Sequence, residues 1–352
     1  MGRYTEAERV VRDGLAVDPA SGRLLSVLAW VLRLRRDYPG ALAAADAAVA
    51  ADPSLADAHA ERAETLISLL RAADAVSPAR EAVRLAPLRP SGHLVLARAL
   101  SSARRREEAR EAAAHGQRLD PSSVEGLLTV AEVDREAGHH DSAFAAARAA
   151  LALDPANPYA LWLVAMLDAE RLRVRRSMRV LRDVARDNPA RTDVLAMTWP
   201  IRGVLGGLRR GLPLGAALVG VLMLAAMRWP FVGDFARLLS VVVALVLLGF
   251  ALRVLVPAGR LPWRCLRLVP RLTRRGTVAG LVTAGVAVTL LLAYAVSTWW
   301  ILALVAFLLS GPMWMFGLLE LLGAGLDHPG YRHALLDLAG DFRSWWRSIR
   351  RW

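Results

Sequence analysis

The sequence predicts an all-α protein of two parts: an array of helical hairpins, followed by a bundle of four membrane-spanning helices. Two observations support this fold class. In the first half, six prolines lie 34 residues apart, and a fixed period of that size is typical of stacked repeats. In the second half, the 43 residues of 277–319 contain no charge, and about 20 helical residues suffice to cross a bilayer.

The proline series sets the register of the repeats. Proline has no N–H to donate and disfavours helix at the residue before it, so each of these steps ends one pair of helices. An Asp or Asn precedes five of the six prolines, which are Pro19, Pro53, Pro87, Pro121, Pro155 and Pro189. With the proline at position 32 of a repeat, the second to sixth repeats begin at Gly22, Ala56, Pro90, Val124 and Pro158.

Small residues recur at three positions of this register, where helices must approach closely. Position 8 is alanine five times: Ala29, Ala63, Ala97, Ala131 and Ala165. Position 20 is Ala7, Ala41, Ala75, Ala109, Ala143 and Ser177, and position 27 is Gly14, Ala48, Ala82, Gly116, Ala150 and Val184. An alanine-rich bundle without repeats is the alternative, and the strict proline register argues against it.

In period and in small residues, residues 1–191 resemble the tetratricopeptide repeat (TPR) family, which implies a solenoid of helical hairpins that binds proteins. Two features depart from the family pattern. Position 4 carries Leu or His in place of an aromatic residue, and the apolar position 11 becomes Asp134 and Asp168. Residues 4–17 correspond to the second helix of a repeat, so we expect an upstream start or another chain to cover their apolar face.

The resemblance also implies where a partner would bind, because in this family the first helices of the repeats line a concave groove. We select eight groove residues: Trp30, Arg33, Glu64, Arg98, Glu132, Arg135, Tyr159 and Trp162. The three aromatic residues are candidate anchors, since interface hot spots favour large aromatic side chains. The alternative is that they pack within the solenoid.

The second half is predicted to be a membrane domain. We expect a linker over residues 192–210 and a membrane domain over 211–322, with spans at 211–227, 238–256, 277–296 and 299–319. Fifteen arginines flank these spans on one side and two on the other. The positive-inside rule therefore places both termini in the cytoplasm of a multi-pass plasma-membrane protein. The absence of lysine and the abundance of Ala, Arg and Leu suggest a high-GC bacterium.

Two segments outside the spans combine arginine with large apolar residues, and we expect them to lie at the membrane surface. One covers residues 260–275, and the other is an amphipathic C-terminal helix over 329–352, for which docking on the repeats or on another copy is the alternative. The predicted interface residues are Arg264, Arg267, Arg271, Arg274, Arg275, Trp299, Trp300, Trp345, Trp346 and Trp352.

Catalytic and metal-binding patterns are absent from the sequence. There is one cysteine, the seven histidines lack metal-ligand spacing, and the predicted spans contain no internal Asp, Glu, His or Lys. We therefore expect no enzyme, cofactor or metal, and since the excess of positive charge lies beside the spans, no nucleic acid.

The sequence predicts a membrane-anchored scaffold that recruits a protein partner through its cytoplasmic groove, with membrane lipid as a second partner. The alternative is a channel or translocation component whose bundle is functional and regulated by the repeats. Homo-oligomer formation stays open.

Overall fold

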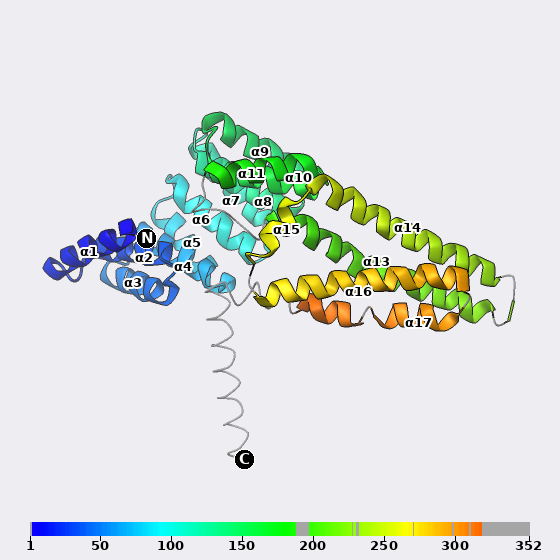
Figure 1. Ribbon diagram of the computed structural model, residues 1–352. Helices are drawn as coiled ribbons and strands as arrows, with labels where there is room; N and C mark the ends of the chain where they lie inside the picture. Colours follow the sequence, from blue (N-terminus) through cyan, green and yellow to red (C-terminus); the bar gives the residue numbers. More distant parts are fainter. Residues whose placement is uncertain are drawn as a thin grey trace, which may run out of the picture. The chain divides into compact units, whose positions relative to one another are not determined.

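The computed structural model describes residues 2–187, 197–226, 228–229, 232–269, 271–297, 299–309 and 311–318. These residues form helices and short connections without a strand, so the all-α prediction is confirmed over them. The chain divides into two compact units, one containing Met1–Leu167 and the other Asp168–Gly325 (Figure 1). This boundary falls within the predicted sixth repeat, before residue 191.

The first unit is a series of antiparallel helices of nearly constant length. The first helices of the repeats begin at the five residues that the proline register predicts, so that register is confirmed. The helices are α1 (Gly2–Val17), α2 (Gly22–Leu34), α3 (Tyr38–Ala51), α4 (Ala56–Ser68), α5 (Ala72–Leu85), α6 (Pro90–Ser102), α7 (Arg106–Leu119), α8 (Val124–Ala137), α9 (His140–Leu153) and α10 (Pro158–Glu170).

The turn inside every hairpin uses the same backbone geometry. Position 15 is left-handed in each repeat, at Arg36, Leu70, Arg104, Gly138 and Leu172. The N–H of the next residue then donates to a carbonyl five residues earlier, which caps the end of the first helix; Arg105 N lies 2.9 Å from Leu100 O. Only glycine adopts this conformation without a steric cost, so four of the five turns accept strain of about 1 kcal/mol each.

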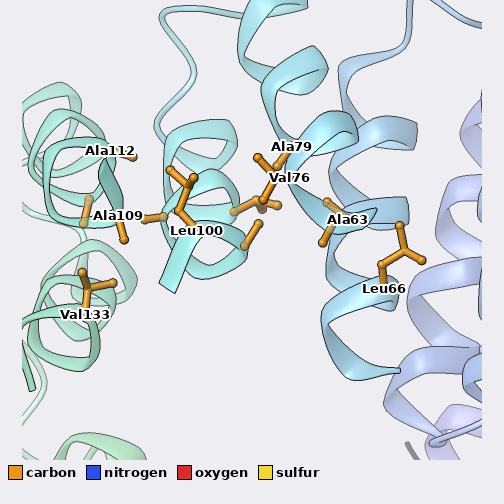
Figure 2. Packing of buried hydrophobic residues seen from close by; sticks show 13 residues of the cluster. Ala63, Leu66, Val76, Ala79, Leu100, Ala109, Ala112 and Val133 are labelled. Carbon is orange, nitrogen blue, oxygen red and sulfur yellow. The ribbon is translucent and has the colours of Figure 1, made fainter. Parts of the chain in front are cut away.

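Alanine brings the helices together, as the small-residue pattern predicts. The position-8 residues Ala29, Ala63, Ala97, Ala131 and Ala165 are fully buried. Ala41, Ala75, Ala109 and Ala143 at position 20 are equally inaccessible. Figure 2 shows one of these contacts, in which Ala63, Ala79 and Ala109 lie among Leu66, Val76 and Leu100.

Polar residues replace the family's apolar ones at position 11, and each has a specific partner. Asp134 is buried, accepts a hydrogen bond from Nε of Arg110 at 2.7 Å, and also accepts one from the Ser142 hydroxyl. Asp168, in the second unit, is inaccessible, and Nε of Arg176 lies 3.1 Å from its Oδ2. Arginine therefore neutralises the carboxylate at both places, as burial of a charge requires.

Histidine at position 4 joins consecutive repeats. Nε2 of His59 lies 2.9 Å from the Pro53 carbonyl oxygen, and Nε2 of His93 lies 2.8 Å from that of Pro87. Since a carbonyl only accepts, Nε2 carries the proton in both. The histidines thus bind the proline that ends the preceding repeat.

The second unit contains α11 (Val174–Asp187), α13 (Trp199–Ala226), α14 (Val232–Ala258), α15 (Leu261–Leu266), α16 (Arg271–Ser297) and α17 (Trp300–Leu308). Residues 311–318 are helical again after α17. Four helices are long and apolar enough to cross a membrane: Trp199–Ala226, Val232–Ala258, Arg271–Ser297 and Trp300–Leu318.

Of the linker that we expect over residues 192–210, the part from Trp199 onward belongs instead to α13. The reason is a stripe of glycines, Gly207, Gly211 and Gly215, on the face that α13 packs against α14. A Cβ on Gly215 would collide with Cγ1 of Val243, and one on Gly207 would lie 2.5 Å from Cε1 of Phe250. Small residues four apart let two helices approach closely in a membrane, which keeps this basic segment helical.

Two further glycines make room for Arg209 of α13. A Cβ on Gly317 would lie 2.7 Å from Cζ of Arg209, and one on Gly280 of α16 would lie 3.6 Å from its Nη2. The second unit therefore packs a cation between helices, two residues before the point where the sequence predicts the first span to begin.

Candidate binding groove

The first helices of successive repeats lie side by side, because α2 contacts α4, α4 contacts α6, and α6 contacts α8. Together they line a groove with a volume of about 910 Å³. Four of the eight predicted site residues line it: Trp30 and Arg33 from α2, Glu64 from α4 and Arg98 from α6. The other four, on α8 and α10, do not line this groove.

The predicted groove face consists of positions 2, 5, 9, 12 and 13 of the first helices, and it is too narrow to include five further residues that line the groove. Val27, Glu61 and Val95 occupy position 6, one residue beyond the predicted position 5. Leu55 and Arg89 occupy position 34, just before the first helix of the next repeat begins. On a helix of about 3.6 residues per turn, position 6 lies only about 40° around the axis from position 2, so it could have been included.

The charges of the groove pair across repeats. Nε of Arg33 on α2 donates to Glu61 on α4 at 2.5 Å, and Nη2 donates to its second oxygen at 3.2 Å. Arg89 also pairs with Asp57. A two-pronged bond of this kind fixes the geometry of both side chains, so these residues help to hold neighbouring repeats in register.

Arg98 is the most connected residue of the groove. Its Nε donates to Glu64 at 2.7 Å, and its Nη1 donates to Glu125 and to the Thr129 hydroxyl, both at 3.2 Å. Burial disfavours its charge, but the carboxylates of Glu64 and Glu125 outweigh that effect and raise the pKa of Arg98. Arg98 therefore stays ionised while linking α4, α6 and α8.

Glu132 lies on α8, beside this network. Burial raises the pKa of Glu132 to about 7, with Glu136 adding to the effect and Arg98 opposing it. Near neutral pH the side chain therefore exchanges a proton. Arg135, also on α8, is partly buried and belongs to the same electrostatic neighbourhood.

One end of the groove is apolar and accessible. Val27 and Trp30 on α2 are 41% and 48% exposed, although both are large and hydrophobic. Arg23, one turn before Val27, is exposed beside them and forms none of the ion pairs described above. Three residues at spacings of four and three share one helix face, so this surface combines an aromatic ring, an aliphatic side chain and a cation.

The two aromatic residues of α10 form a separate pair. Tyr159 and Trp162 stack with ring centroids 5.5 Å apart and an angle of 17° between planes. Tyr159 is 42% exposed, whereas Trp162 packs against the core formed with α8 and α9. Its Nε1–H is buried and has no hydrogen-bond partner among the described residues. Trp162 thus fits the alternative that it packs within the solenoid better than the prediction that it anchors a partner.

The predicted membrane-interface residues fall at the two ends of α16. Arg264 and Arg267 are exposed on or just after α15, and Arg271, Arg274 and Arg275 lie in the first turns of α16. Trp299 and Trp300 follow its last turn and are 70% and 56% exposed. The predicted helix over 329–352, with Trp345, Trp346 and Trp352, lies outside the described residues.

The sequence matches no family profile and no curated relative. Solved structures similar to the fold include a thermophilic TPR protein of Thermus thermophilus, with 21% identity, a TM-score of 0.47, and coverage of 49% of this chain and 94% of that one. They also include YrrB, described as a TPR protein with an unusual peptide-binding site, with 16% identity, a TM-score of 0.36 and coverage of 53% and 95%. PilF of Pseudomonas aeruginosa has 19% identity, a TM-score of 0.43 and coverage of 53% and 83%. Each of these likenesses covers about half of this chain.

Proposed function

We propose that this protein is a membrane-anchored scaffold that recruits a protein partner through the groove of its helical repeats. The four apolar helices of the second unit act as the anchor, with both termini in the cytoplasm, where the repeats meet the partner. The scaffold is not an enzyme: it contributes a binding surface and a location.

The surface of Arg23, Val27 and Trp30 is the observation that carries the proposal. The other charged groups of the groove satisfy one another, through Arg33 with Glu61 and Arg98 with its carboxylates. Trp30 is 48% exposed and takes part in none of these ion pairs. Large aromatic side chains beside a cation are the usual anchors of protein interfaces, so the partner contacts this end of the groove.

A crosslinking pull-down from intact membranes tests the proposal. We compare the full-length protein with Trp30→Ala and with Leu88→Ala, which removes an apolar side chain that is 81% exposed outside the groove. Capture of a specific protein that Trp30→Ala abolishes and Leu88→Ala preserves supports recruitment through the groove. Trp162 is not a useful target, because truncating it would also disturb the core.

The anchor role has its own test. Replacing the four apolar helices by an unrelated membrane anchor should leave partner capture unchanged. If capture is lost while the replaced protein still reaches the membrane and its repeats remain folded, the bundle itself is functional, as in the channel or translocation alternative.

A further inference from the structure

A hollow of about 380 Å³ in the second unit is surrounded by four arginines. Arg175, Arg179 and Arg182 project from one face of α11, at spacings of four and three residues, and Arg260 lies at the start of α15. Its remaining lining is apolar and comes mainly from the end of α14 and the start of α15. We call this the arginine hollow. Its volume is within the range of small-ligand sites.

The positive charge of the arginine hollow is largely uncompensated. No acid lines it. Within the described part of the chain, Arg182 has a weak contact with its neighbour Asp183 at 3.4 Å, and no salt bridge involves Arg175, Arg179 or Arg260. All four arginines are exposed. This contrasts with the groove, where each partly buried arginine forms an ion pair with a carboxylate. Guanidinium groups gathered without acids form a ready site for a phosphate, which they bind through paired N–H donors.

The position of the hollow indicates the source of that phosphate. Pro257 and Ala258, which line the hollow, are the last residues of α14. This helix has the highest mean hydropathy of the four candidate spans, 2.7. If α14 crosses the membrane, the hollow lies at the level of the phospholipid head groups. Its apolar lining and its cations then match the acyl and phosphate portions of one lipid molecule.

We propose that the arginine hollow binds the phosphate head group of an anionic phospholipid and so fastens α11 to the membrane surface. This inference rests on the proposed membrane anchoring. It adds a site outside the predicted set of membrane-interface residues, since Arg175, Arg179 and Arg182 lie within the sixth repeat by sequence. The arginines of α15 and α16 strengthen the same positive field but do not line the hollow.

The test uses the full-length protein in nanodiscs of phosphatidylcholine, with and without a minority of phosphatidylglycerol, and native mass spectrometry to count retained lipids. The variant is Arg175→Gln/Arg179→Gln/Arg260→Gln. Its charge-matched control is Arg9→Gln/Arg104→Gln/Arg106→Gln, which changes three exposed arginines of the first unit. Each arginine near an anionic surface contributes a factor of about five in affinity, so the hollow variant should lose about a hundredfold. The control should retain phosphatidylglycerol as the unchanged protein does.

Equal retention by both variants would overturn the proposal. So would displacement of the lipid by inorganic phosphate at equal concentration, because the hollow would then take free phosphate. A variant with lysine at the three positions keeps the charge and loses only the paired donors, so it guards against a folding defect. Carbonate extraction of the membranes tests anchoring separately. Protein in the supernatant would refute membrane anchoring. Protein in the pellet, together with an unchanged lipid affinity of the hollow variant, would refute lipid binding by the hollow alone.

Discussion

Replacing Arg98 by alanine should open the middle of the repeat array. The change removes the bonds to Glu64 and Glu125 and leaves the Glu64 carboxylate, with only 15% of its side chain exposed, without its hydrogen-bonded counter-ion. The Glu64 bond is charge-assisted and mostly buried, which is worth about 2 kcal/mol. The bond to Glu125, whose side chain is 63% exposed, adds about 0.5 kcal/mol.

Hydrogen exchange followed by mass spectrometry on the full-length protein measures this loss locally. In a repeat array each unit is stabilised by its neighbours, so the opening free energies of α4, α6 and α8 should fall together. A loss of about 2 to 2.5 kcal/mol corresponds to about a 30- to 70-fold drop in protection. The control is Arg71→Ala, whose pair with Asp74 is half exposed on both sides; protection there should change by less than about threefold.

The double change Arg98→Leu/Glu64→Leu sharpens the prediction. Removing both charges leaves no unpaired carboxylate at position 64, so protection of α6 should recover most of the loss. If Arg98→Ala affects α6 no more than Arg71→Ala affects α5, the ion pairs of the groove are not structural. Arg33 and Arg98 would then remain available to a partner.

Three further predictions concern stability. Because burial raises the pKa of Glu132, the stability that its protonated form contributes is complete below pH about 4.5 and is lost as pH rises through about 7. Thermal unfolding should show a loss of about 3 kcal/mol over that window, absent in Glu132→Gln; an unchanged pH profile would contradict it. Gly138→Ala should destabilise α8 by about 1 kcal/mol in hydrogen exchange, because φ is +90° there, and an unaltered α8 would count against the strain argument. Gly215→Val should disrupt the packing of α13 on Val243 and reduce folded yield, whereas Gly220→Val, with open space around its Cβ, should not; equal yields would refute the glycine stripe.

The repeat register was predictable from the sequence because it follows from local chemistry. Proline ends a helix and alanine permits close approach wherever they occur, so the five first-helix starts and the buried position-8 alanines followed directly. The left-handed residue at position 15 did not, since Arg36, Leu70 and Arg104 carry no local signal for that conformation. Their geometry is imposed by the helices on either side.

The roles of Asp134 and Arg33 depend on partners that lie far away in the sequence. Asp134 looks like a defect in an apolar position until Arg110, 24 residues earlier, is seen to neutralise it. The groove arginines suggest binding residues, but Glu61, at a position that was not considered, already occupies Arg33. Only the packed structure shows which charges remain accessible.

The boundaries of the apolar second half were hard to predict for a related reason. Composition marks where apolar residues begin, and residues 202–210, rich in glycine and arginine, therefore suggest a linker. The glycines are instead a packing surface, with Gly207 and Gly215 four residues to either side of Gly211. That spacing was present in the sequence and could have extended the first span towards the N-terminus.

The most direct test of the account is photo-crosslinking from position 30 in native membranes. Trp30 is replaced in the full-length protein by a photoreactive phenylalanine, which keeps an aromatic ring at the exposed end of the groove. The same replacement at Leu88, an exposed site outside the groove, is the control. The account predicts a discrete protein adduct from position 30 that is absent from position 88. Identical adducts from both positions, or no protein adduct from position 30, would contradict recruitment through this groove.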